Sequence, residues 1–227
     1  MRPRLGIPAY GYPGEGVWEK LGSLEPGALV IMDPADGPGR PIDPRYLSAV
    51  SAAARSGLRV FGYVTTDYGR RSAAAMEAEV ERYRDWYQPS GVFLDQAPAS
   101  ISSSTPIVEV VERIRRWNMS LAINPGQPDI DPTDAALADY VINFEGPYST
   151  YRRTRFPKWV RDANTTFWHL VYEVKDVRTM RAVASMAAHT RAGIVYITDA
   201  TMPNPWERLP TYWLEEQGLL GQSRRRL

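Results

Sequence analysis

Gly91-Val-Phe-Leu-Asp-Gln96 is the stretch of sequence that best indicates the fold. Val92, Phe93 and Leu94 form an uninterrupted apolar run, which is typical of a strand buried on both faces, as in a parallel sheet. The run delivers a carboxylate, Asp95, at its C-terminal end. In a parallel barrel such an end faces the mouth, where catalytic groups gather. A helix N-cap or a loop acid is the other interpretation of an acid in this position.

Short apolar runs alternate with helical stretches along the whole chain. Most runs end in polar or small residues, and helix signals such as Asp43-Pro44 follow them. About eight such strand-helix units, each of about 25 to 30 residues, are what a (β/α)8 TIM barrel requires. The predicted strands cover residues 5–10, 28–32, 58–64, 91–95, 120–124, 140–144, 167–172 and 193–199.

The predicted fold class is therefore α/β, with a single (β/α)8 barrel over residues 1–227 and a short basic tail at 222–227. A doubly wound open sheet is the alternative, and it would need a Gly-rich phosphate-type turn after its first strand. The turn that follows the first strand, Gly11-Tyr-Pro-Gly14, is interrupted by proline. The expected helices include 17–24, 105–117, 134–138 and 176–189.

Composition limits the classes of function. Lys and Arg total 27 and Asp and Glu total 26, so the formal net charge of +1 provides no basic field for nucleic acid or a membrane surface. The chain has no cysteine, which excludes disulfides and thiolate metal sites. Its two histidines lack the spacing of a zinc motif, and phosphate-loop and dinucleotide fingerprints are absent. We expect no cofactor and no transition metal, while an acidic Mg²⁺ site using Asp33 or Asp199 stays open.

The sequence as given shows no targeting segment. Residues 1–8 lack the apolar core of a signal peptide. Apolar runs are too short everywhere to cross a bilayer, so we expect no membrane span. Hydrophobic residues make up 44% of the chain, which is ample for one core, and we expect the protein to act as a monomer.

Two carboxylates are predicted to meet at the barrel mouth. Asp95 ends the fourth strand and Glu145 follows the sixth. Because the C-terminal ends of the strands converge on one face, the two side chains are expected to face the same opening. Most glycosidases require a pair of carboxylic side chains. One protonates the leaving oxygen, and the other attacks the anomeric carbon or activates water.

Other strand ends carry groups suited to carbohydrate. Aromatic rings offer flat faces for sugars, and polar side chains offer partners for hydroxyl groups. Alternation along each strand sends about half of these side chains outward, where an aromatic ring is simply core. His169 fits a hydrogen-bonded barrel residue better than a base, because no Ser or Cys nucleophile motif accompanies it. The candidate substrate-binding residues are Tyr10, Asp33, Tyr63, Asp67, Gln96, Asn124, Asn143, His169, Tyr196 and Asp199.

Motifs spread over nearly the whole chain resemble the spherulin-4 family. They are Val30-Ile-Met-Asp-Pro-Ala-Asp-Gly-Pro-Gly39, Phe61-Gly-Tyr-Val-Thr-Thr-Asp-Tyr-Gly69, the Asp95 strand, Asn124-Pro-Gly126, Phe144-Glu145, Tyr196-Ile-Thr-Asp199, Pro205-Trp206 and Leu209-Pro-Thr-Tyr-Trp213. That family includes glycoside hydrolase family 135, barrel enzymes that cleave α-1,4-linked N-acetylgalactosamine in galactosaminogalactan, a microbial exopolysaccharide. Many members are secreted or surface-anchored, so the resemblance implies an extracellular or cell-surface location.

The resemblance implies an endo-α-1,4-N-acetylgalactosaminidase-like hydrolase with Asp95 as nucleophile and Glu145 as acid/base. The family's strand motif commonly reads Asp-Glu, whereas Gln96 holds the second position here. An amide cannot ionise, so Gln96 is expected to donate a hydrogen bond to a substrate hydroxyl or acetamido group. The alternatives are a non-catalytic carbohydrate-binding barrel and a structural or developmental surface protein.

Overall fold

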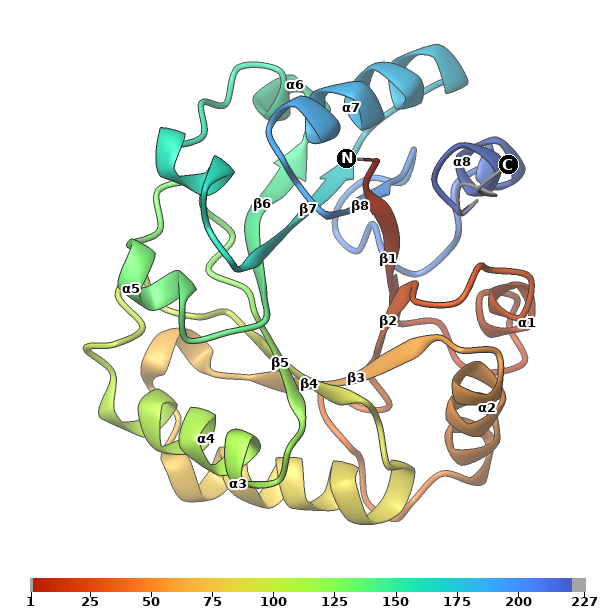
Figure 1. Ribbon diagram of the computed structural model, residues 1–227. Helices are drawn as coiled ribbons and strands as arrows, with labels where there is room; N and C mark the ends of the chain where they lie inside the picture. The colour runs from red at the N-terminus through yellow and green to blue at the C-terminus, as the bar shows by residue number, and fades with distance from the viewer. Residues whose placement is uncertain (1, 222–227) are drawn as a thin grey trace, which may run out of the picture.

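Eight short strands pair in parallel and in sequence order, and the last closes onto the first to form a barrel (Figure 1). The computed structural model describes residues 2–221 of the chain, so the predicted basic tail at 222–227 lies outside the described residues. The predicted α/β barrel is confirmed. Its strands are β1 (Arg4–Ala9), β2 (Leu29–Met32), β3 (Arg59–Thr65), β4 (Gly91–Asp95), β5 (Ser120–Ile123), β6 (Tyr140–Pro147), β7 (Thr166–Tyr172) and β8 (Ile194–Ile197).

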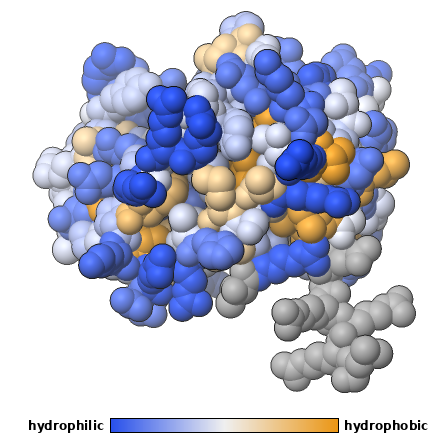
Figure 2. Space-filling view, turned by 90° about the horizontal axis from the view of Figure 1, so that it is seen from above, coloured by the Kyte–Doolittle hydropathy of each residue, from blue (hydrophilic) through white to orange (hydrophobic). Residues whose placement is uncertain are grey.

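Helices surround the barrel (Figure 1). Several begin at side-chain caps, as when the carboxylate of Asp43 accepts a hydrogen bond of 2.8 Å from the amide of Arg45. The side of the molecule that carries α6 and α7 is covered mostly by hydrophilic residues (Figure 2). The helices are α1 (Trp18–Leu21), α2 (Pro44–Arg55), η1 (Asp67–Gly69), α3 (Ala73–Arg82), η2 (Tyr83–Tyr87), α4 (Thr105–Arg116), α5 (Pro132–Ala135), α6 (Tyr148–Tyr151), η3 (Lys158–Arg161), α7 (Val177–His189) and α8 (Trp213–Leu220).

Most strand boundaries lie within two residues of the sequence-based expectation, and the larger differences are in the short helices and in β6. The helices expected at 17–24 and 134–138 are the single turns α1 and α5, and α5 starts earlier because Asp131 caps it and Pro132 opens it. Strand β6 continues beyond residue 144 to Pro147. Helix α8 was not predicted, because its buried face includes the acid Glu216 and so shows no clean apolar stripe.

The interior of the barrel is a packed core and not a channel. Phe93 of β4 and Trp168 of β7 belong to strands that are not neighbours, and their ring centroids lie 6.4 Å apart across the interior. Gly6 leaves the space that Trp168 occupies, because a Cβ there would clash with the indole. At the N-terminal end, Arg59 donates to the hydroxyls of Tyr140 (2.6 Å) and Ser120 (2.5 Å). In barrels of this kind the active site lies at the C-terminal ends of the strands, so we expect the functional residues there.

A membrane-spanning helix is not found within residues 2–221: none of the helices there has the length and apolar character to cross a bilayer.

Candidate active site

Polar residues from distant segments of the sequence lie at the C-terminal face of the barrel. Asp95 is the last residue of β4, Asn124 follows β5, and Glu145 lies near the end of β6. Asp33 follows β2 and Asp199 lies just beyond β8. Only β5 separates β4 from β6, as the sequence predicted. These residues therefore share one opening, the mouth of the barrel.

The side-chain amide of Asn124 joins the two acids. Its Nδ2 atom donates one hydrogen bond to Oδ1 of Asp95 and another to Oε2 of Glu145. The two bonds measure 2.7 Å and 2.6 Å, so the accepting oxygens are at most about 5.3 Å apart. Asn124 is 5% exposed, which keeps this bridge largely away from water. Asp95 and Glu145 are called the carboxylate pair below.

A bulge in β6 directs Glu145 into the mouth. The pairing with β7 shifts register between Ile142 and Phe144, so that Asn143 is an extra residue. Tyr140 faces the barrel interior, and strict alternation from it would turn Phe144 inward and Glu145 outward. Instead Phe144 packs outside the sheet against a ring of α6, with centroids 4.7 Å apart, and Glu145 reaches the bridging amide. Bulges commonly re-aim side chains beside active sites in this way.

Burial and mutual charge set the acidity of the carboxylate pair. Burial, and then the charge of Asp95, raise the pKa of Glu145 to about 7, although hydrogen bonds from Asn124 and Trp206 oppose the shift. Burial also raises the pKa of Asp95, but a backbone amide and the side chains of Asn124 and Tyr63 donate hydrogen bonds that lower it. Glu145 therefore holds a proton near neutral pH, and Asp95 is the better stabilised anion.

Two tyrosines stand beside the carboxylate pair. The rings of Tyr10, which follows β1, and Tyr63 of β3 meet edge to face with centroids 5.9 Å apart. Burial, followed by the charges of Asp95 and Glu145, raises the pKa of Tyr10 well above its ordinary value. The pKa of Tyr63 is raised by burial and by the charge of Asp95. Both phenols therefore stay protonated and available as hydrogen-bond donors.

Asp33 is a third acid with a raised pKa at the mouth. Burial is the main cause and brings the pKa to about 6, and the negative charges of Asp36 and Asp95 add to it. A hydrogen bond of 2.8 Å from the amide of Gly37 to Oδ1 works in the opposite direction. Asp33 thus lies within the electrostatic influence of Asp95, and its role in substrate binding stays a prediction.

Trp206 contacts Glu145, and this contact was not predicted from the sequence. It lies in the loop after β8, and its hydrogen bond to Glu145 lowers the pKa of that acid. Tyr172 and Tyr196 hold the indole, each with its ring centroid 6.0 Å away. Tyr196 is buried and its hydroxyl contacts the carbonyl of Arg208 at 3.4 Å, so it supports Trp206 instead of lining the mouth as predicted. A loop tryptophan far along the chain carries no local signal of such a contact.

Two predicted substrate ligands are paired with arginine, and their contact with substrate stays a prediction. Asp67 receives hydrogen bonds from Arg70 at 3.1 and 2.5 Å, and these lower its pKa. Burial would raise the pKa of Asp199, but hydrogen bonds from Thr211 and Arg208 outweigh it and hold the pKa below its ordinary value. Asp67 and Asp199 are called the arginine-paired acids below. Their carboxylates are engaged in holding loops.

His169 is not at the mouth, and Asn143 is buried within the sheet. His169 is fully buried on the helix side of the sheet, where its ring stacks on Phe156 and its Nδ1 atom lies 2.8 Å from the hydroxyl of Tyr151. Burial lowers its pKa to about 3, so it is neutral. Asn143, the bulge residue, is also fully buried. The expectation that His169 contacts substrate is therefore wrong, because its ring packs on the helix side of the sheet, whereas the role of Asn143 stays a prediction.

Gln96 stands at the edge of the mouth. Its side chain is exposed, and its Oε1 atom accepts a hydrogen bond of 2.7 Å from the hydroxyl of Thr65. The amide nitrogen of its side chain remains for a substrate, in line with the predicted donor role. Across residues 2–221, no three His, Cys, Asp or Glu side chains gather in a group that would hold a metal ion.

The family model for Spherulation-specific family 4 (Spherulin4) matches residues 4–218. The chain belongs to the spherulin-4 family. Spherulin-4 of Physarum polycephalum is 26% identical over 213 residues, which are 86% of this chain and 63% of that relative. The chain thus spans less than two thirds of the length of this curated member of the family.

A solved structure shares the fold of this spherulin-4 family member. The crystal structure of Aspergillus clavatus Sph3 in complex with GalNAc superposes with a TM-score of 0.82. The match covers 97% of this chain and 98% of that one, at 20% sequence identity. At that identity the likeness establishes the barrel and its closure, and the chemistry of this chain must be argued from its own side chains.

Proposed function

We propose that the protein is a retaining glycoside hydrolase with Asp95 as nucleophile and Glu145 as acid/base. The observation that carries the proposal is the bridge made by Asn124, which limits the two carboxylate oxygens to a separation of at most about 5.3 Å. Carboxyl groups of retaining enzymes lie about 5 to 5.5 Å apart, whereas inverting enzymes need about 6.5 to 9.5 Å to admit a water molecule.

The acidities support this assignment of roles. A pKa of about 7 leaves Glu145 mostly protonated below neutral pH, as a general acid must be when substrate binds. Asp95, with three hydrogen-bond donors directed at it, is suited to attack as an anion. When Asp95 becomes esterified to the sugar, its negative charge disappears, and with it one cause of the raised pKa of Glu145. Glu145 then loses its proton more readily and acts as the base that activates water.

The proposed substrate is a polysaccharide with α-linked N-acetylgalactosamine or galactosamine, cleaved within the chain. Membership of the spherulin-4 family supports this substrate class, and so does the GalNAc bound to Sph3, which has the same fold. The mouth also has the composition of a sugar site. Tyr10, Tyr63 and Trp206 supply aromatic surface, and Asp33 and Gln96 supply polar partners for hydroxyl or acetamido groups.

A carbohydrate-binding barrel without catalysis is the second candidate, and Gln96 is the observation that favours it. The family's strand motif commonly has an acid at this position, and the amide of Gln96 cannot donate or accept a proton in catalysis. In that function the carboxylate pair would bind sugar hydroxyls without turnover.

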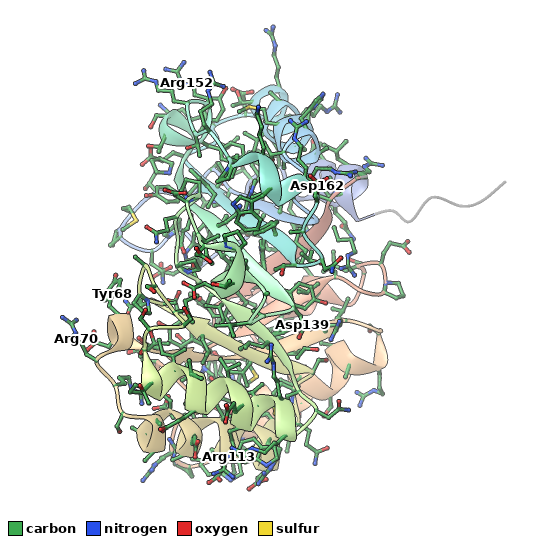
Figure 3. All side chains as sticks on the ribbon, turned by 60° about the vertical axis from the view of Figure 1, so that its left-hand side comes forward. Tyr68, Arg70, Arg113, Asp139, Arg152 and Asp162 are labelled. Atoms are coloured by element: carbon green, nitrogen blue, oxygen red, sulfur yellow. The ribbon has the colours of Figure 1, made fainter. Side chains whose placement is uncertain are left out.

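The test is the release of new reducing ends from acetylated and deacetylated galactosaminogalactan. We expect release by the wild-type protein and none by Asp95→Asn or Glu145→Gln. Asp162→Asn is the matched control, because it makes the same change in an exposed acid that precedes β7, at the other end of the barrel (Figure 3). Binding of polymer without release at any pH would support the second candidate.

A further inference from the structure

Tyr68 is an exposed aromatic residue at the mouth of the barrel. Its side chain lies in η1, directly after β3, and 59% of the residue surface is accessible. Tyr68 and Arg70 project from one end of the barrel, while Asp139, which precedes β6, lies toward the other end (Figure 3). The tyrosine ring is therefore on the side of the molecule where the strands end and the carboxylate pair lies.

The backbone around Tyr68 is strained. Asp67, Tyr68 and Gly69 have φ angles of 48°, 54° and 81°, all in the left-handed region. Glycine adopts this region freely and aspartate is enriched in it, but a bulky side chain such as that of Tyr68 is uncommon there. Strain of this kind persists only where surrounding contacts impose it, and it concentrates at ligand-binding sites.

Hydrogen bonds to Gln96, the residue after β4, impose this conformation. The amide of Tyr68 donates to the carbonyl of Gln96 at 2.8 Å, and the hydroxyl of Thr66 donates to the same carbonyl at 2.7 Å. The hydroxyl of Thr65 accepts from the amide of Asp67 at 3.0 Å and donates to the side chain of Gln96. Gln96 directly follows Asp95, the proposed nucleophile. The Tyr68 backbone is therefore hydrogen-bonded to the residue next to the nucleophile.

Arg70 orients the ring from one side. Its guanidinium carbon lies 5.9 Å from the centroid of the Tyr68 ring, and Asp67 fixes the guanidinium with two hydrogen bonds. Since the residue is still mostly exposed, the ring retains surface open to a ligand. The arginine-paired Asp67 thus has a structural purpose, which is to hold Arg70 against the tyrosine.

Packing does not account for this arrangement. Single exposed aromatic residues are ordinary on protein surfaces, and most need no explanation. Tyr68 differs because it is not part of the hydrophobic core, and yet a hydrogen bond to Gln96 holds its backbone in an unfavourable conformation. A ring that is fixed but unburied is suited to stack against a flat, partly apolar ligand such as the face of a sugar.

We propose that Tyr68 is a stacking platform for a sugar unit next to the one held by the carboxylate pair, and that Gln96 positions it. The site would then bind an oligosaccharide and not only a single sugar, which suits cleavage within a polymer. This inference rests on the proposed substrate class, but stacking requires binding alone and not turnover.

The experiment measures binding by calorimetry in a Glu145→Gln background, so that no ligand is consumed. The probes are free N-acetylgalactosamine and an α-1,4-linked oligosaccharide of it. We expect Tyr68→Ala to weaken binding of the oligosaccharide about 3- to 10-fold and to leave the single sugar unchanged. Tyr68→Phe keeps the ring and should bind as the parent does. Leu214→Ala, at a 76% exposed site on α8, is the surface control.

The possible outcomes test the stacking role of Tyr68 separately from the proposed hydrolase activity. An equal loss for both probes would show that the substitution disturbs the whole mouth, and no loss for either would show that Tyr68 touches no sugar; both results overturn the inference. Failure of the parent to bind the oligosaccharide overturns it as well. If the wild-type protein releases no reducing ends and yet the length-dependent loss is found, the platform stands and the hydrolase does not.

Discussion

The carboxylate pair and the arginine-paired acids both lie where strands end, but their pKa values are shifted in opposite directions. Asp95 and Glu145 have no Lys or Arg partner within the described residues, and burial raises the pKa of each. Asp67 and Asp199 are bonded to Arg70 and Arg208, and the pKa of each is lowered. An acid at a strand end is therefore not catalytic by its position alone. What distinguishes the carboxylate pair is that its charge is left uncompensated.

The largest expected difference between the two sets of acids is in activity. Asp95→Asn and Glu145→Gln should each lower the rate of reducing-end release by about 10²- to 10⁴-fold or more, because each removes a group that acts in the transition state. Asp67→Asn should lower it less than about tenfold, because that carboxylate only orients Arg70. Equal losses in all three variants would mean that the distinction between the sets is wrong.

The pH dependence of the rate should follow the same pair. Activity should fall as pH rises through about 7, because Glu145 then loses the proton that it donates. Activity should also fall at acidic pH, as Asp95 takes up a proton.

Asn124→Ala removes a hydrogen bond that lowers the pKa of both groups, so the descending alkaline limb should move to higher pH. An alkaline limb that stays in place in this variant would contradict the role of the bridge.

The free energy of unfolding should depend on pH in opposite directions for the two sets of acids. The folded-state pKa of Glu145 is raised from 4.5 to about 7, so the free energy of unfolding should decrease as pH rises through that window. Glu145→Gln removes the buried charge and should stabilise the protein at pH 8 by on the order of 2 to 3 kcal/mol, with little effect near pH 4.5.

Asp199 should contribute to stability with the opposite pH dependence. Its folded-state pKa is lowered, so its contribution is present at neutral pH and is lost as pH falls through its ordinary range. Asp199→Asn should therefore destabilise the protein at pH 7. Urea unfolding of both variants at pH 4.5 and 8 checks the signs, and destabilisation by Glu145→Gln at pH 8 would show that its charge is compensated after all.

The barrel could be predicted from sequence because its signals are local. Apolar runs such as Val92 to Leu94 and the Asp43-Pro44 helix start report on their own segments, and alternation of such signals specifies the topology. The convergence of Asp95 and Glu145 followed from that topology. The bulge at Asn143 and the contact between Trp206 and Glu145 depend on pairing between distant segments, which no local pattern encodes.

The departure at Gln96 is expected to have the smallest effect. Gln96→Glu keeps an oxygen that can accept the hydrogen bond from Thr65, so the loop that carries Tyr68 should be retained. The added charge beside Asp95 should raise the pKa of the carboxylate pair and leave the rate equal or moderately lower. A gain of about 10²-fold or more would instead show that position 96 is where the catalytic acid belongs, and that Glu145 has another role.

The stereochemistry of the first product tests the central claim most directly. Proton NMR during early hydrolysis of an α-1,4-linked N-acetylgalactosamine oligosaccharide distinguishes the two anomers of the new reducing end before they equilibrate. With Asp95 and Glu145 held within about 5.3 Å by Asn124, we expect the α anomer to appear first, with the configuration retained. Initial appearance of the β anomer would contradict the account, because inversion requires a water molecule between two more widely separated carboxylates.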